Sequence, residues 1–323
     1  MISSFDSVET IQKSLLKNNY LADRKTATTI FLAVRMQKPV LVEGPAGVGK
    51  TYLARSLAAA GGMNLIRLQC YPGLDEGKAL YEWNYQKQLI YLQSLKDNKS
   101  WDEIRSEIYT GEFLLSRPVL KAFMSPEPAV LLIDEADKSD DEMESFLLEA
   151  LSEYQVTIPE MGTVHAVNIP LVIITSNNSR DFSDAMKRRC LHLYMPFPDQ
   201  QREEAIIRLH IKDINSRLAG QVAAFLSGVR KMALRKSPGI AETIDWAKAL
   251  MVMGVNDLDP GSVRLTLNAL VKYEEDIAAI ESKADTLIQT AEPVNVSAST
   301  QVLPGSPEPA TTHADNLLAR FDF

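Results

Sequence analysis

Short apolar runs recur through the first two thirds of the chain and alternate with longer amphipathic stretches. The runs are KPVLVEG, NLIRLQC, AVLLIDE, PLVIITSN and LHLYM. They lack the 3.6-residue period of a helix, and continuous apolar runs of this length are typical of strands covered on both faces. The pattern therefore predicts repeated strand and helix units that build a parallel sheet in an α/β domain.

The pattern changes after Pro198. From there to about residue 280 only helical periodicity occurs, as in GSVRLTLNALVKYEEDIAAI, where Val263 and Leu267 share a face. From residue 284 the chain mixes Pro, Ser, Thr and Ala with few large apolar groups, so burial cannot offset its ordering entropy. We expect an α/β domain with N-terminal helices over 1–198, a smaller helical domain over 199–283, and a disordered low-complexity tail over 284–323.

Composition narrows the possible partners. The chain has 323 residues, 46% of them hydrophobic, which is enough for a sizeable core. Its formal net charge of -8 argues against broad binding to nucleic acids or anionic membranes, because both are polyanions. The apolar runs are far shorter than the roughly 20 residues needed to cross a bilayer. With two cysteines and no leader-like start, a reducing cytosol is expected, and no zinc-site spacing occurs.

One motif carries specific chemistry. Residues 44–51 read GPAGVGKT and fit G-x-x-x-x-G-K-[ST] between a predicted strand and a predicted helix. The glycines let backbone N–H groups face a phosphate, Lys50 reaches the terminal phosphates, and Thr51 offers a hydroxyl to Mg²⁺. A chance Gly-rich turn is the alternative, which the flanking strand and helix disfavour. The predicted nucleotide-binding residues are Gly44, Pro45, Ala46, Gly47, Val48, Gly49, Lys50, Thr51 and Tyr52.

Two acids close the run AVLLIDE. Asp134 ends a predicted buried strand, where its carboxylate can hold the Mg²⁺ water shell beside Thr51. Glu135 is placed to orient and deprotonate a water molecule, which favours hydrolysis over transfer to a second substrate. Alternatively, Glu135 only begins a helix, where acids are favoured. Three more aspartates could form a further metal site, although capping and solvating the next helix is the favoured interpretation: Asp137, Asp140 and Asp141.

Polar and basic side chains follow the next predicted strand. Asn177 comes at its carboxyl end, where an amide can hold the attacking water and sense the γ-phosphate; an Asx turn is the alternative. About ten residues later come Lys187, Arg188 and Arg189. An arginine supplied to the transferring phosphoryl group raises turnover by roughly 10³ to 10⁵-fold. A solvated basic turn is the alternative, and the order of the preceding motifs favours the catalytic interpretation.

The order of GPAGVGKT, VLLIDEADK, TSNN and DAMKRRC, followed by a helical segment, resembles the AAA+ ATPases and more narrowly their MoxR branch. The resemblance implies a P-loop NTPase core with an all-α lid, ATP and Mg²⁺ as cofactors, and hydrolysis coupled to protein remodelling. It assigns Asn177 to sensor 1 and Arg189, with Arg188 as runner-up, to the arginine finger. Arg264 of DPGSVRLTL takes the sensor 2 position, a surface arginine being the alternative.

A narrower resemblance covers about residues 20–280. The segments LQCYPGLDEGKALYEWNYQKQLI, FLLEALSEYQVTIPEMGTVHA and AETIDWAKAL are similar to MoxR-type proteins associated with maturation of carbon monoxide dehydrogenase and related molybdenum hydroxylases. This implies a homo-oligomeric ring, usually a hexamer, a metalloenzyme client and a partner with a von Willebrand factor A domain. A DNA-directed AAA+ motor and a P-loop small-molecule kinase are the alternatives. The net charge argues against the first, and Glu135 with the Asn and Arg elements against the second.

Two segments are candidates for contact with substrates or partners. Residues 71–109 separate two predicted strands by more than a crossover helix requires, and we expect most of their aromatic side chains to pack onto the core. The segment VTIPEMGTVHAVNI predicts a β-hairpin with residues 159–162 at its tip. By resemblance, such hairpins reach toward the pore of a ring, which makes Met161 a candidate contact.

Overall fold

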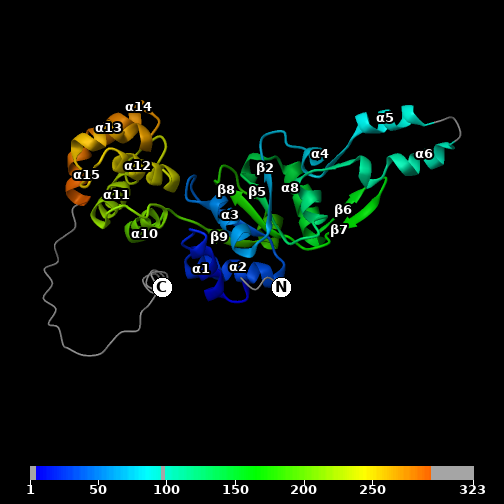
Figure 1. Ribbon diagram of the computed structural model, residues 1–323, viewed down its shortest axis with the longest axis horizontal. Coiled ribbons are helices and arrows are strands. Elements are labelled where there is room, and N and C mark those ends of the chain that lie inside the picture. Colours follow the sequence, from blue (N-terminus) through cyan, green and yellow to red (C-terminus); the bar gives the residue numbers. More distant parts are fainter. Residues whose placement is uncertain (1–4, 96–98, 292–323) are drawn as a thin grey trace. The chain divides into compact units, whose positions relative to one another are not determined.

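The computed structural model describes residues 5–95 and 99–291 (Figure 1). These residues divide into two compact units. The first is built mainly from residues 25–44 and 50–195, and the second from residue 196 onward together with residues 19–24 and 45–49. No helix in the described part of the chain is long and apolar enough to cross a membrane.

A five-stranded parallel sheet forms the centre of the first unit, with the strand order β2-β5-β8-β1-β9. Each strand falls on one of the predicted apolar runs, so the predicted α/β fold is confirmed. Their bounds are β1 (Val40–Glu43), β2 (Asn64–Gln69), β5 (Ala129–Asp134), β8 (Leu171–Ser176) and β9 (Leu191–Tyr194). Because the strands are parallel, their carboxyl ends lie at one edge of the sheet, which is where Asp134 and Ser176 end their strands.

The expectation that all five strands are covered on both faces is wrong for the two edge strands. β5 and β8 are buried along their whole length, and β1 is nearly so. β2 and β9 instead alternate between buried and more exposed positions. The packed helices cover the middle of the sheet, so one face of each edge strand meets solvent.

Helices cover both faces of the sheet (Figure 1). α3 (Lys50–Gly61) contacts β2, β5 and β8, and α1 (Val8–Lys17) packs on α3. On the opposite face, Leu131 and Ile133 of β5 join α7 (Pro118–Phe123) and α8 (Asp141–Glu153) in one apolar cluster. The first unit also contains α2 (Arg24–Met36), α9 (Asp184–Arg189) and the short 3₁₀ helix Ala136–Lys138.

A hairpin extends the first unit, and it confirms the prediction. β6 (Gln155–Ile158) and β7 (Gly162–His165) pair antiparallel, with Ile158 opposite Gly162. Gly162 has φ +85°, a backbone conformation that favours glycine. Met161 at the tip is 37% exposed, so its side chain is accessible on the surface of the unit.

The insertion over residues 71–109 also has structure of its own. It contains α4 (Glu76–Ala79), β3 (Tyr81–Trp83), α5 (Tyr85–Ser94) and α6 (Trp101–Ile108), and β3 pairs with β4 (Leu114–Ser116). Its aromatic side chains divide into two groups. Four pack on the core, with Trp83 buried and the tyrosines partly buried: Tyr81, Trp83, Tyr91 and Tyr109. Tyr71, Tyr85 and Trp101 are exposed, so the packing expectation holds for most of the aromatics but not for these three.

The second unit is helical, as predicted. Its helices are α10 (Gln200–His210), α11 (Ser216–Val229), α12 (Ile240–Val252), α13 (Pro260–Leu270), α14 (Glu274–Glu281) and α15 (Ala284–Ala291). Trp246 is fully buried at its core, where the indole N–H donates to Thr266 Oγ1 at 2.8 Å. The stretch GSVRLTLNALVKYEEDIAAI is two helices, since α13 ends at Leu270 and α14 begins at Glu274.

The boundary of the predicted tail is wrong for its first eight residues, which form α15. Ala284 is fully buried, and α15 contacts α11 and α13. Leu287 and Ile288 pack partly buried against the same core, so this short segment has enough apolar surface to be ordered by packing. The rest of the predicted tail, 292–323, lies outside the described residues.

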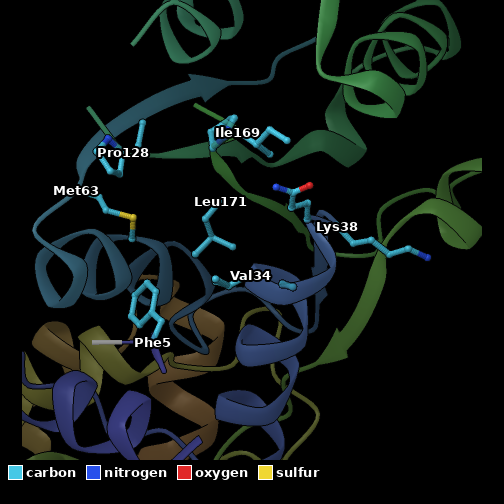
Figure 2. Close-up of a pocket in the computed structure, with 11 residues that line it drawn as sticks. Phe5, Val34, Lys38, Met63, Pro128, Ile169 and Leu171 are labelled. Atoms are coloured by element: carbon cyan, nitrogen blue, oxygen red, sulfur yellow. The ribbon is translucent and has the colours of Figure 1, made fainter. Parts of the chain in front are cut away.

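A small apolar pocket of about 110 Å³ lies at the amino ends of the strands (Figure 2). Phe5, Val34, Met63 and Leu171 line it, and Lys38 lies at its border. Leu171 begins β8, so the pocket is at the edge of the sheet opposite the one where the strands end. None of the predicted nucleotide-binding residues lines it.

Candidate nucleotide site

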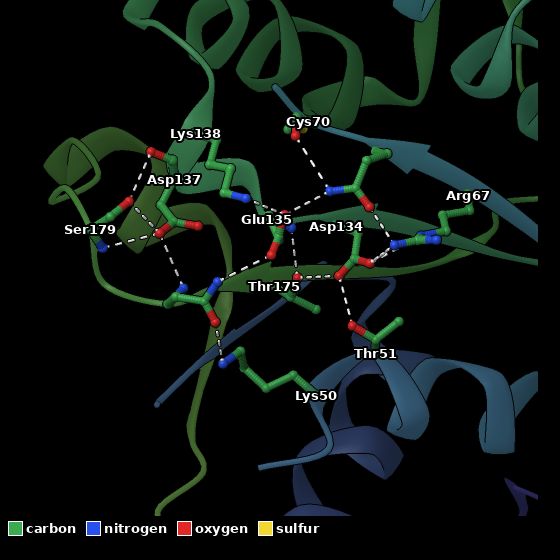
Figure 3. A network of polar contacts seen from close by, with 12 residues as sticks. Lys50, Thr51, Arg67, Cys70, Asp134, Glu135, Asp137, Lys138, Thr175 and Ser179 are labelled. Carbon is green, nitrogen blue, oxygen red and sulfur yellow. Dashed lines mark hydrogen bonds and ion pairs between the residues drawn. The ribbon is translucent and has the colours of Figure 1, made fainter. Parts of the chain in front are cut away.

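Lys50 and Asn177 lie in direct contact at the carboxyl edge of the sheet (Figure 3). The Lys50 ammonium donates to the Gly44 carbonyl at 2.7 Å and to Asn177 Oδ1 at 2.8 Å. Only 7% of Lys50 is exposed, and burial lowers the pKa of its ammonium to about 8 although three nearby carboxylates oppose the shift. A desolvated cation of this kind gains most from an anionic ligand such as a phosphate.

Two glycines of the loop are required by its geometry. Gly44 has φ +150°, and a side chain there would come within 2.1 Å of the Met195 carbonyl oxygen. Gly47 has φ +83° and meets Gly239, at the start of α12, so closely that a Cβ would lie 2.7 Å from the Gly239 Cα. The Gly47 carbonyl accepts a hydrogen bond from Ile240 N–H at 2.8 Å. The first turn of α12 therefore supports the phosphate-binding loop directly.

Thr51 and Asp134 form the predicted metal-binding pair. Thr51 Oγ1 donates to Asp134 Oδ1 at 2.9 Å, and Thr175 Oγ1 donates to the same oxygen at 2.7 Å. Asp134 is almost fully buried. Hydroxyl and carboxylate oxygens are the hard donors that Mg²⁺ takes, one or two at a time, beside nucleotide phosphates. The pair fits Mg²⁺. The described residues contain no group of three or more His, Cys, Asp and Glu side chains that could hold a metal ion.

Arg67 is a partner of Asp134 that sequence reasoning missed. It lies on β2, and its Nε and Nη2 atoms donate to Asp134 Oδ2 at 3.0 and 2.5 Å. The guanidinium is partly exposed whereas the carboxylate is buried. A charge-assisted pair of donors on one oxygen, with two hydroxyls on the other, fixes the orientation of the Asp134 carboxylate.

Glu135 lies next to Asp134 with its backbone in the left-handed region at φ 55°. Its N–H donates to Thr175 Oγ1 at 2.8 Å. Its Oε2 atom accepts from Gln69 at 2.9 Å and from the Lys138 ammonium at 2.7 Å, and Oε1 accepts from the Asn177 amide at 3.5 Å. Glu135 is also the N-cap residue of the 3₁₀ helix Ala136–Lys138, as the alternative expects, but its side chain makes no capping hydrogen bond and contacts Gln69, Lys138 and Asn177 instead.

Asp137 does not have the expected capping role. It is buried, and its Oδ2 atom accepts from Asn177 N–H at 3.2 Å, Ser179 N–H at 3.0 Å and the Ser179 hydroxyl at 2.6 Å. Burial raises the pKa of this carboxyl, but the hydrogen bonds from Ser179 and Asn177 outweigh it, so the net pKa is lowered. Asp140 does cap α8, and Asp141 is exposed in its first turn, as predicted.

Asn177 and Asn178 follow β8 directly, and their side chains make different contacts. Asn178 takes the left-handed conformation at φ 58°, and its N–H donates to Ser176 Oγ at 3.0 Å. The side chain of Asn177 is not used for this turn, because it contacts Lys50 and Glu135 instead. The Ser176 hydroxyl closes this turn by accepting the N–H two residues on, so the alternative Asx turn at Asn177 is not formed.

The basic cluster occupies the last turn of α9, and all three side chains are exposed. Lys187 lies 3.4 Å from Asp181. The guanidinium groups of Arg188 and Arg189 have no hydrogen bond or ion pair with any residue in the described ranges. Their guanidinium groups are thus available at the surface of the unit.

Arg264 contacts another helix of the second unit. It lies on α13, half exposed, with its guanidinium 3.5 Å from Asp285 of α15. Within the second unit, the phosphate-binding loop is contacted by the start of α12. The sensor 2 assignment of Arg264 stays a prediction.

A glycine loop before a helix, a hydroxyl and carboxylate pair, a second acid and an amide on the neighbouring strand define a P-loop nucleotide-hydrolysing domain. Residues 39–190 match the family AAA domain (dynein-related subfamily). This segment is therefore an AAA domain of that subfamily. At the level of the family, such a domain is a nucleotide-hydrolysing ATPase that acts with a divalent metal, typically Mg²⁺.

Two curated proteins are distantly similar to the chain. The gas vesicle ATPase GvpN of Haloferax mediterranei is 24% identical over 231 residues, which cover 69% of this chain and 64% of GvpN. The match therefore spans a little less than two thirds of that protein. The protein named Uncharacterized protein SH1500, of Staphylococcus haemolyticus, is 23% identical over 254 residues, covering 75% of this chain and 89% of its own length.

Among solved structures, the RuvB Holliday junction branch migration motor of Thermotoga maritima is similar at 16% identity with a TM-score of 0.44. The similarity covers 87% of this chain and 79% of RuvB. A RuvB variant from the same organism gives a TM-score of 0.45 at the same identity and coverage.

Proposed function

We propose that the protein is an Mg²⁺-dependent ATPase of the MoxR branch that works as a ring of identical subunits. Its hydrolysis site is made from two of them. The observation that carries this proposal is a contrast within one subunit. Asp134, Glu135 and Asn177 form hydrogen bonds with other side chains of the site. Arg188 and Arg189 are exposed, and their guanidinium groups have no partner in the described residues.

Each group in the site has a role that its contacts favour. Lys50 binds the terminal phosphates with a desolvated ammonium. Thr51 and Asp134 hold Mg²⁺, which supplies charge neutralisation at the β- and γ-phosphates when it is bound. Glu135 orients the attacking water and accepts its proton, and Asn177 donates its amide to the γ-phosphate or to that water. Arg189, with Arg188 beside it, comes from the neighbouring subunit and stabilises the charge of the transition state.

The client of the motor is proposed from sequence resemblance alone. The segments at residues 68–90, 146–166 and 241–250 are similar to MoxR-type proteins of the molybdenum hydroxylase and carbon monoxide dehydrogenase maturation subgroup. We infer that the protein remodels such a metalloenzyme together with a von Willebrand factor A domain partner. Activation of purified, inactive hydroxylase should then require ATP, and it should be lost with the Glu135→Gln variant.

The dependence of hydrolysis on assembly tests the ATPase proposal. Specific ATPase activity should rise with protein concentration, and light scattering should show a nucleotide-dependent increase in mass over the same range. Full activity in a monomer contradicts the shared site. Activity that appears only with a small-molecule acceptor favours a kinase, and salt-sensitive binding to plain duplex DNA with stimulated hydrolysis favours a DNA motor.

A further inference from the structure

The segment that leads from Asn177 to the arginines of α9 is held at two points by the segment that follows Glu135. Asp137 provides the first point through its three hydrogen bonds to Asn177 and Ser179 (Figure 3). Glu144, on α8, provides the second. The catalytic carboxylate and the arginine helix are therefore joined by two short, directly bonded pieces of chain.

Glu144 is buried, with only 4% of it exposed, and both of its carboxylate oxygens are used. Oε1 accepts from Ser183 N–H at 2.8 Å, and Oε2 lies 3.0 Å from Arg180 Nη1. Ser183 is the N-cap residue of α9, and its hydroxyl accepts from Met186 N–H. The buried carboxylate thus fixes the residue at which α9 begins.

Arg180 ties the same segment to α8 a second time. Its Nη1 atom also donates to Asp141 Oδ1 at 3.0 Å, and Nη2 donates to the Asp140 carbonyl at 3.4 Å. The guanidinium carbon lies 5.3 Å from the centre of the Phe182 ring, which is buried in the core. Asp141 is exposed and Glu144 is buried, so the bond to Glu144 is the stronger one, because charge-assisted hydrogen bonds shielded from solvent are directional and stronger than neutral ones.

A helix as short as α9 takes its direction from its anchors. With six residues it is far below the length at which an isolated helix is stable. Its one buried side chain is Met186, and its two arginines are exposed in the last turn. A small change at Ser183 would therefore be passed to the guanidinium groups about one and a half turns further along.

We propose that Glu144 and Arg180 are positioning residues that set the direction of α9, and with it the arginines that each subunit lends to its neighbour. The link passes from Glu135 and Asn177, which contact the subunit's own nucleotide, to Arg188 and Arg189, which serve the next one. It couples successive sites around the ring. This inference rests on the proposed function, in which the arginines act in trans.

The test mixes inactive variants. Glu144→Gln keeps an acceptor for Ser183 but removes the charge that holds Arg180, and its turnover should fall about 10²-fold, the loss expected when a catalytic group is displaced by about 1 Å. Its affinity for a fluorescent ATP analogue should be unchanged, because its own site is intact. Mixed with Glu135→Gln subunits, which have well-placed arginines but no catalytic acid, Glu144→Gln should regain activity. Arg180→Gln should behave in the same way and guards against a folding defect of one variant.

Two controls separate the possible failures. Glu149→Gln removes an exposed charge from the same helix and should keep wild-type turnover. Arg189→Ala mixed with Glu135→Gln should regain activity if the arginine acts in trans. The positioning role is wrong if the Arg189→Ala mixture regains activity and the Glu144→Gln and Arg180→Gln mixtures do not. It is also wrong if Glu144→Gln and Arg180→Gln, each alone, turn over at the wild-type rate. If the Arg189→Ala pair itself stays inactive, the shared site is wrong and this inference is lost with it.

Discussion

The carboxyl edge of the sheet and the end of α9 differ in how far their charges are satisfied within one subunit. At the sheet edge, Asp134 accepts hydrogen bonds from two hydroxyls and a guanidinium, and Glu135 accepts from three side chains. At the end of α9, Arg188 and Arg189 are exposed, and no partner lies in the described residues. One region is a closed network, and the other presents two unneutralised cations.

The acids at the sheet edge are held in place before the nucleotide binds. The arginines of α9 have no such partners, which is expected if they act on the nucleotide of a neighbouring subunit. Preorganised polar groups favour a transition state because they need no rearrangement at the moment of reaction. An arginine that acts in trans cannot be preorganised by its own subunit beyond the direction of its helix. The contrast therefore favours one complete set of catalytic groups per pair of subunits.

Removing an arginine should have the largest effect. Arg189→Ala should lower turnover by roughly 10³ to 10⁵-fold, the range for loss of an arginine finger. ATP affinity should stay close to wild type, since the subunit's own phosphate-binding residues are untouched. Lys187→Ala, one turn or less away on the same helix, is the matched control and should keep its turnover. Turnover is measured by steady-state phosphate release. If Arg189→Ala and Lys187→Ala lower it equally, the effect comes from the positive charge of the helix end in general and not from a specific arginine.

Removing the base should have the next largest effect. Glu135→Gln should lower turnover by about 10² to 10⁴-fold, the usual range for a general base. The amide keeps the shape of the side chain and can still bond to Gln69 or Asn177, so nucleotide binding should be retained. A filter-binding assay with ATP beside the turnover assay separates the two properties. A variant that loses binding and turnover together would mean that Glu135 organises the site instead of accepting a proton.

Loosening the closed network should have the smallest effect and should depend on pH. Asp137→Asn weakens charge-assisted bonds to Asn177 and Ser179, and should lower the free energy of unfolding by about 1.5 to 3 kcal/mol near neutral pH. The folded-state pKa of Asp137 is lowered, so its contribution is fully present above its ordinary pKa and is lost as the pH falls through the lower folded value. Denaturant titrations should therefore show a difference between wild type and variant that shrinks in acid. A constant difference would assign the loss to packing.

The nucleotide-binding motifs could be predicted from the sequence because each one lies within a few consecutive residues. Lys50 and Thr51 follow a glycine loop, and Asp134 ends an unbroken apolar run, so spacing along the chain is sufficient to find them. The five strands were visible for the same reason. The helix α15 was missed altogether, because its apolar contacts, Leu287 and Ile288, are few and lie in a polar segment whose packing partner is a helix far away in the sequence.

The residues that hold the acids could not be found in this way. Gln69 pairs with Asp134 in register across two parallel strands, and Arg67 lies two positions before it on the same face. Nothing in the sequence states that β2 is the neighbour of β5, because strand order depends on how the crossovers pack. The alternating polar positions in NLIRLQC were a usable signal of an edge strand. That Arg67 and Gln69 contact Asp134 and Glu135 became evident only from the pairing of β2 with β5.

The claim that one site needs two subunits is tested most directly by diluting wild-type protein with the double variant Glu135→Gln, Arg189→Ala at constant total concentration. Energy transfer between labelled subunits would first establish that they exchange. Each working site then needs a wild-type subunit beside another, so ATPase activity should fall as the square of the wild-type fraction. A fall in direct proportion to the wild-type fraction would mean that every subunit hydrolyses ATP with its own arginine, and the account would be wrong.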